Sequence, residues 1–253
     1  MIKLLKCEYM KTRGRWIFVT ALILTAMQLA WTLHGNLNEF MIQNGWRMLL
    51  YQLPLTNTIF LPILSVIVSS RLADTEHKGV MLKQLAVITD KGKVYDAKFI
   101  YGLAIVLLCI LINIAVVIVF GYYMGFPGNV PLDLYLPFFL STLVPTIEIY
   151  IISHTLSLLY KNQAVTFFTG ILGTFAGLFS MFLPQIPLLR QLLPWGHYGT
   201  LQFMGMFGWT KEERYANAYF ENMGMDWKMF AVIAAVCVIL YIVGRKLFIK
   251  KEM

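Results

Sequence analysis

Glu148 is the residue of this sequence with the clearest chemical potential, because it is the only carboxylate well inside a long apolar stretch. A carboxylate near the middle of a bilayer is costly unless it is neutral, paired or facing water. Ser141 and Thr155 lie seven residues before and after it, so the three share one helical face that we expect to look into a helix bundle or a cavity. Two roles stay open for this face, a hydrogen-bonded structural glutamate and the lining of a transport path. Asn113, near the middle of another apolar stretch, is most simply a hydrogen-bonding residue between helices and is a fourth path candidate.

The sequence lacks the signatures of soluble enzymes. It has no GxxxxGK[ST] phosphate loop, no HExxH, no CxxC and no GxSxG. We therefore expect a protein that is not an enzyme, has no catalytic or metal site and binds no cofactor itself. If it takes part in ATP-driven work, ATP and magnesium must bind to a separate chain.

A charged segment, residues 71–98, separates two uncharged runs that are each long enough to cross a bilayer. Its excess of lysine and arginine predicts that it faces the cytosol. Within it, residues 74–87 can form a helix that begins at Asp74 or Thr75 and carries an apolar ridge. The ridge consists of Met81, Leu82 and Leu85. A short amphipathic helix at this place needs a partner, and a soluble protein would fit.

The composition is that of an integral membrane protein. A hydrophobic content of 58%, a charged content of 13% and a mean hydropathy of +0.67 are expected for a membrane domain and not for a soluble domain of this length. We predict one all-α integral membrane domain over residues 1–253 with six transmembrane helices. The predicted spans are residues 16–33, 48–70, 99–124, 132–159, 163–183 and 229–244.

The distribution of charge gives the expected topology. Most of the 21 basic residues fall in segments that six spans place inside the cell, together with both termini. The net charge of +8 therefore indicates topology and not a nucleic-acid partner. Residues 1–15 have the pattern of an interfacial helix on an anionic inner leaflet of membrane lipids, although an ordinary basic flank is an equal alternative.

Two further segments have patterns of their own. Residues 184–228 combine Pro, Gly and Trp, which suits re-entrant or surface helices at the outer leaflet, or else an aromatic belt with no ligand role. In the span before them, small residues recur every three or four positions and admit another helix at close range. The glycines of this stripe are Gly170, Gly173 and Gly177. The helix that they contact belongs either to a second chain or to the same bundle.

Three stretches carry a family resemblance that extends over nearly the whole chain. They are the opening MIKLLKCEYMKTRGRWIF, the run EHKGVMLKQLAVITDKGKVYDAKF after the second predicted span, and LPWGHYG after the fifth. This arrangement resembles the ABC-2-type transporter permeases, in particular the small membrane subunits of lantibiotic self-immunity and bacitracin-type peptide exporters. The opening of this chain resembles the basic elbow helix of that family. The run after span two resembles the family's coupling helix, which docks on the ATPase subunit.

The resemblance implies an ATPase-coupling role for the residues of this run, and Lys98 matches the terminal lysine of the family's run. The coupling candidates are Asp74, Glu76, His77, Lys78, Gly79, Met81, Leu82 and Leu85. It also implies a pair of six-span permeases, identical or different, that work with two ATPase chains. The glycine stripe is a candidate for the contact between the two permeases. Such a complex in a bacterial cell membrane would remove an amphiphilic antimicrobial peptide from the bilayer, for self-immunity or resistance.

Other functions are compatible with the same sequence. An ABC-2 permease for sodium, a lipid or a drug is the first alternative. A membrane scaffold or sensor subunit that transports nothing is the second. A secondary transporter ranks last, because the spans hold a single carboxylate and no visible repeat.

Overall fold

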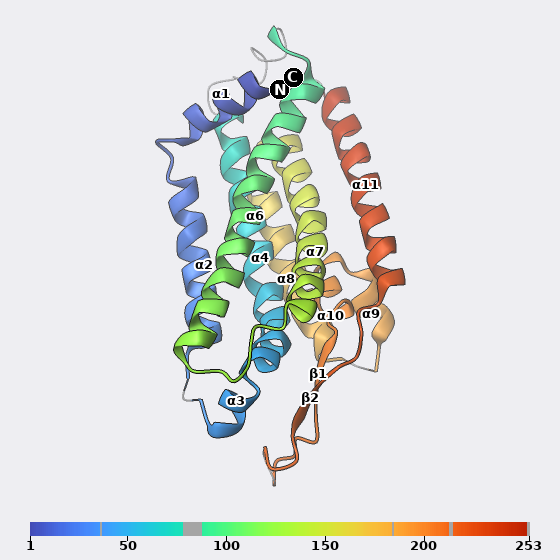
Figure 1. Ribbon diagram of the computed structural model, residues 1–253. Helices are drawn as coiled ribbons and strands as arrows, with labels where there is room; N and C mark the ends of the chain where they lie inside the picture. The colour runs from blue at the N-terminus through green and yellow to red at the C-terminus, as the bar shows by residue number, and fades with distance from the viewer. Residues whose placement is uncertain (36, 78–87, 184, 213–214, 252–253) are drawn as a thin grey trace.

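The computed structural model describes residues 1–35, 37–77, 88–183, 185–212 and 215–251. Long helices lie side by side and form one bundle (Figure 1). These helices are α2 (Ile17–Leu33), α4 (Gly45–His77), α6 (Lys91–Tyr123), α7 (Leu132–Leu159), α8 (Ala164–Met181) and α11 (Trp227–Lys250).

The two ends of the bundle are built differently. Helix α1 (Ile2–Thr12) lies across one end, where it meets α2 at an angle of 76°. The N-terminus and the last turn of α11 lie at this end, which we call the α1 end (Figure 1). The opposite end, which we call the hairpin end, carries short elements. These are α3 (Glu39–Gln43), α9 (Pro187–Leu192), the 3-10 helix η1 (Pro194–Gly196), α10 (His197–Thr200), β1 (Met204–Phe207) and β2 (Tyr219–Asn222).

Five described helices are long and apolar enough to cross a membrane, namely α4, α6, α7, α8 and α11. A sixth span is obtained if the bent pair of α1 and α2 counts as one. The prediction of an all-α membrane protein is therefore confirmed in its coarse form, and the count of six spans stays a prediction. Helices α4 and α6 have 33 residues each, about 50 Å, and so extend beyond a hydrocarbon core of about 30 Å.

The expected start of a separate helix at Asp74 or Thr75 is wrong. Helix α4 continues without a break through both residues and ends at His77. The sequence RLADTEH contains no Gly or Pro to end the helix, and Leu72, Ala73, Thr75 and Glu76 are buried against neighbouring elements. The rest of the predicted coupling helix, residues 78–87, lies outside the described residues.

Helix α4 is the central helix of the bundle. It packs against α7, α8, α2 and α6, whereas α11 packs against α7 and α6. Pro54 and Pro62 lie within α4 and do not end it, and the hydroxyl of Thr58 donates a hydrogen bond of 2.8 Å to the carbonyl of Pro54. Because neighbours surround α4 on all these sides, most of its residues are buried.

The hairpin of β1 and β2 is absent from the sequence-based expectation, which placed only helices between the fifth and sixth spans. The two strands pair antiparallel, with Met204 opposite Asn222 and Phe207 opposite Tyr219. Met204 and Phe220 are buried in an apolar cluster at the hairpin end. Strands of four residues are too short to give a clear alternation of apolar and polar residues, so the sequence pattern did not predict them.

Candidate functional site

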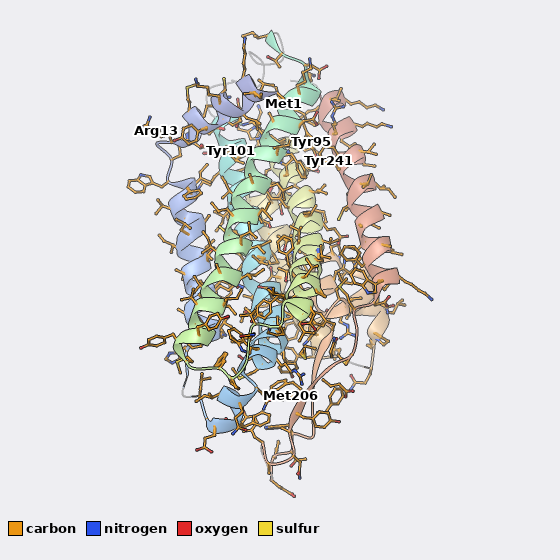
Figure 2. The ribbon with its side chains drawn as sticks, in the orientation of Figure 1. Met1, Arg13, Tyr95, Tyr101, Met206 and Tyr241 are labelled. Carbon is orange, nitrogen blue, oxygen red and sulfur yellow. The ribbon has the colours of Figure 1, made fainter. Side chains whose placement is uncertain are left out.

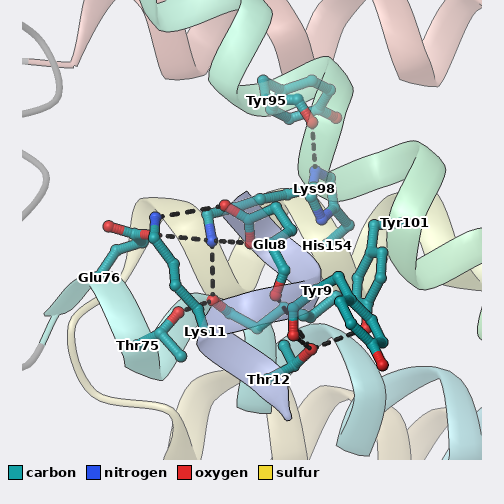
Figure 3. A network of polar contacts seen from close by, with 11 residues as sticks. Glu8, Tyr9, Lys11, Thr12, Thr75, Glu76, Tyr95, Lys98, Tyr101 and His154 are labelled. Carbon is teal, nitrogen blue, oxygen red and sulfur yellow. Dashed lines mark hydrogen bonds and ion pairs between the residues drawn. The ribbon is translucent and has the colours of Figure 1, made fainter. Parts of the chain in front are cut away.

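Four charged side chains from three elements meet at the α1 end of the bundle. Glu8 and Lys11 come from α1, Glu76 from the last turn of α4, and Lys98 from the first part of α6. Their charged groups point toward one another (Figure 3). We call these four residues the charge cluster.

Lys98 is the centre of the charge cluster and is fully buried. Its Nζ donates to Glu8 Oε2 at 2.7 Å and to the carbonyl oxygen of Leu72 at 3.1 Å, and lies 2.9 Å from Glu76 Oε1. An ammonium group has three N–H donors, so each donor of Lys98 has an acceptor. The buried charge is therefore both paired and hydrogen-bonded.

Lys11 closes the charge cluster on its outer side. Its Nζ is 2.7 Å from Glu76 Oε1 and 3.4 Å from Glu8 Oε1, and its side chain is partly exposed. Two cations thus face two carboxylates, and the cluster is neutral as a whole. Removal of one member would leave an unpaired buried charge, which makes such a cluster sensitive to substitution.

Helix α1 docks on the bundle through a polar face. Glu8 and Thr12 are its buried residues, and the Thr12 hydroxyl is 2.7 Å from the hydroxyl of Tyr101 on α6. The apolar Ile2 and Met10 are exposed instead. Because residues three or four apart share one helical face, the polar residues meet α4 and α6 while the apolar ones turn outward. This inverted arrangement suits a helix at a membrane surface.

The described coupling candidates lie at the end of α4 and make contacts inside the chain. Glu76 belongs to the charge cluster, and His77 Nε2 is 2.9 Å from the carbonyl oxygen of Ser157 on α7. Asp74 lies one turn before them in the same helix. The other candidates lie outside the described residues, and their coupling role stays a prediction. These are Lys78, Gly79, Met81, Leu82 and Leu85.

Sequence reasoning missed Glu8 and Lys11 as partners of Glu76 and Lys98. One signal was present, because Glu8 is the single acidic residue among five basic residues in positions 1–15. An acidic residue in a basic flank weakens the attraction of the flank to an anionic surface. The presence of such a residue therefore indicates that it has a specific partner. The identity of that partner depends on how α1 folds back over α4 and α6.

Glu148 forms a buried pair that links α7 to the short helix α10. Its Oε2 is 2.6 Å from His197 Nδ1, while His197 Nε2 is 2.9 Å from the carbonyl oxygen of Gln191. Burial lowers the pKa of His197, but the hydrogen bond and the charge of Glu148 outweigh it and raise the pKa on balance. A protonated imidazole donates from both nitrogens, which matches these two acceptors. This geometry supports the structural role for Glu148.

The other path candidates have separate surroundings. Ser141 Oγ donates to the carbonyl oxygen of Phe138 at 3.0 Å, and Thr155 Oγ1 is 2.9 Å from the hydroxyl of Tyr95. Asn113 lines a small cavity of about 10 Å³ with Asn57 and Thr142. These three candidates thus have different neighbours from Glu148, and their role in a transport path stays a prediction.

Asn57 belongs to a buried polar array that sequence reasoning missed. Asn57 Oδ1 accepts from Gln28 Nε2 at 2.6 Å, and Asn57 Nδ2 donates to Thr142 Oγ1 at 3.2 Å. These bonds join α2, α4 and α7 within the bundle. Buried amides that bond to each other across helices satisfy polar groups that lipid could not.

The glycine stripe of α8 contacts side chains of the same chain. Gly170 lies against Val66 of α4, while Gly173 and Gly177 lie against Trp195 of η1. The sequence left two partners open for this stripe, a second chain or the same bundle. In the structure these three glycines contact their own bundle.

A comparison with known protein families matches one family to the part of the chain that contains most of these residues. The family described as "ABC-2 family transporter protein" matches residues 4–180. The match includes the charge cluster and Glu148, and it ends within α8. No curated protein matches the chain.

Proposed function

The chain belongs to the ABC-2 family of transporter proteins and is the membrane permease component of an ABC transporter, and we propose that it exports its cargo with energy from a separate ATPase chain. We further propose that the cargo is a lantibiotic or a similar amphiphilic antimicrobial peptide, expelled from the membrane for self-immunity or resistance. The resemblance of residues 1–18, 76–99 and 193–199 to peptide exporters supports this cargo.

The charge cluster is the observation that carries the proposed coupling. It ties α1 to the last turn of α4 and to the first part of α6, the two helices that precede and follow residues 78–87. In the proposed mechanism, two ATPase chains dock on residues 74–87 in the cytosol and move this segment when ATP closes them. The cluster then moves α1, α4 and α6 together, because a packed and paired element responds as one body.

The interior of the bundle favours a cargo that enters from the bilayer. Several buried polar groups of the spans already have partners, as Glu148 does in His197 of α10 and Asn57 does in Gln28. Groups that are already paired are poor ligands for an ion that must lose its water. An amphiphilic peptide that moves along the surface between this permease and a second one, identical or different, needs no such ligands. We therefore favour a peptide over sodium.

The experiment is a mild-detergent purification of the tagged chain from its bacterial membrane, followed by assays of partner identity and ATPase activity with and without lantibiotics. Ile88 directly follows residues 78–87 and is 80% exposed, so Ile88→Asp should disturb little packing among the described residues. We expect this variant, like Leu82→Asp, to lose the ATPase chain and peptide resistance. Met223→Asp, at an exposed position beside the hairpin, is the matched control and should retain both.

Two outcomes would change the assignment. If the wild-type chain purified without any ATPase, a scaffold or sensor subunit would replace the proposed exporter. If an ATPase copurified but a deletion strain became sensitive to sodium, a lipid or a drug and not to peptides, the cargo would be wrong and the permease role would stand.

A further inference from the structure

A groove follows the bend between α1 and α2, and we propose that it binds an anionic phospholipid. The groove has a volume of about 690 Å³ and is open to the outside of the bundle. Arg13 and Tyr101 lie at this corner of the molecule (Figure 2). The groove is formed by the end of α1, the start of α2 and the adjoining face of α6.

The backbone at the bend explains how the groove stays formed. Trp16, the N-cap of α2, has φ 55° and ψ 18°, a left-handed conformation that bulky residues rarely adopt. A strained residue persists where its surroundings hold it, and such residues often lie at binding sites. Contacts on both sides hold this one, because Thr12 bonds to Tyr101 and Ile17 is buried in the main core. The indole of Trp16 therefore stays at the rim of the groove and is largely exposed.

The charge of the groove selects an anion. Arg13 is the one charged residue among those that line it, and they include no carboxylate. Within the described part of the chain no side chain forms an ion pair with Arg13, whereas Lys11, two residues earlier, is engaged by Glu8 and Glu76. A guanidinium group binds phosphate oxygens with two parallel hydrogen bonds. A phosphodiester headgroup fits this free donor.

The depth of the groove selects a lipid. Its floor includes Ile17 and Ile105, which are buried and apolar, and Tyr9 and Trp16 stand at its rim. Aromatic side chains of this kind lie at the level of lipid headgroups, and an acyl chain can follow the apolar floor into the bilayer. Three further basic residues of this region, Lys3, Lys6 and Arg15, are exposed and attract anionic lipids to the surface. The occupant is thus a phospholipid with a net negative headgroup.

The test measures the lipid that stays bound. The full-length protein is reconstituted with phosphatidylglycerol and phosphatidylcholine in equal amounts, released into mild detergent and analysed by native mass spectrometry. We expect wild-type protein to retain phosphatidylglycerol in preference. Arg13→Gln should lower this retention about fivefold, because the guanidinium group that contacts the phosphate inside the groove is lost. Arg15→Gln removes the same charge outside the groove and should change it less than about twofold.

A second pair of variants separates charge from folding. A side chain at Gly14 meets no atom within 4 Å, so both Gly14→Glu and Gly14→Gln fit without a clash. We expect Gly14→Glu to repel the phosphate and lose the lipid, and Gly14→Gln to keep it. Equal retention in Arg13→Gln and Arg15→Gln, or equal retention of both lipids by the wild type, would overturn the proposal. So would increased retention of an added cationic amphiphilic peptide by Gly14→Glu, because the groove would then receive peptide and not lipid.

Discussion

Lys98 on α6 and Glu8 on α1 form an ion pair of 2.7 Å although 90 positions separate them along the chain. The same lysine lies 2.9 Å from Glu76, the residue before the end of α4. This relationship fixes α1 to the two helices that precede and follow residues 78–87. A force applied to that segment would therefore reach α1 through charged contacts as well as through the backbone.

Lys98→Met should destabilise the protein severely. Methionine has a similar length but no charge, so Glu8 and Glu76 would share only Lys11. We expect a loss of about 3–5 kcal/mol, the typical effect of leaving an unpaired charge in a buried cluster. Thermal unfolding in detergent would measure it. Lys93→Met, at an exposed position on α6, is the control and should cost less than about 0.5 kcal/mol. Equal shifts in the two variants would contradict this role of Lys98.

A double-mutant cycle should show that Glu8 and Lys98 act as a unit. With Glu8→Gln and Lys98→Met, we expect a coupling free energy above about 1 kcal/mol, because both groups are buried and in contact. The reference is the pair of Asp96 and Arg245, 2.8 Å apart with the arginine 37% exposed. Water and ions screen that pair, so its coupling should be about 0–1 kcal/mol. A smaller coupling for the buried pair than for the exposed one would show that Glu8 does not hold α1.

The membrane-spanning helices were predictable from the sequence, because apolar length is a local property. Residues 132–159 are the predicted and the observed extent of α7. Helices α4 and α6 are longer than predicted, since Arg71 and Lys98 lie in helical turns beyond the apolar stretches. Hydropathy marks the part of a helix that lies in lipid, and these helices continue past it.

The partners of the charged residues were not predictable, because they depend on contacts between distant elements. The sequence singled out Glu148 as a buried carboxylate, and the motif LPWGHYG contained His197. Nothing local indicated that α10 would place this histidine 2.6 Å from that carboxylate. Glu76 was expected to take part in ATPase coupling, which stays a prediction. Its contact with Lys98 was not foreseen, because it depends on α4 continuing past the apolar stretch to meet α6.

The pair of His197 and Glu148 should make stability depend on pH. Burial lowers the pKa of His197, but its bond to Glu148 and the charge of that residue raise it above the ordinary 6.5. A raised histidine pKa adds stability that is fully present below the unfolded value and is lost as the pH rises through the folded value. His197→Gln should therefore lower the unfolding midpoint more at about pH 5.5 than at about pH 9.

The hydrogen bond between His197 and the charged Glu148 sets the expected size of this effect. At the acid end we expect a loss of about 1.5–3 kcal/mol, typical of a hydrogen bond to a charged group. His34→Gln, at an exposed position, should change the midpoint little at either pH. A difference between wild type and His197→Gln that grows as the pH rises would have the wrong sign for this pair.

Gly177→Ala should destabilise the single chain, because the glycine of α8 lies against a backbone that cannot move freely. A Cβ there would be 2.5 Å from the carbonyl oxygen of Trp195. We expect a loss of about 1–3 kcal/mol in thermal unfolding, as for other overpacked sites. Gly14→Ala, where a Cβ meets nothing within 4 Å, should be neutral within about 0.5 kcal/mol. If Gly177→Ala instead left the unfolding midpoint unchanged and altered only the oligomeric state, the stripe would face a second permease. The contact with Trp195 makes the first outcome the expected one, since its strain arises within one chain.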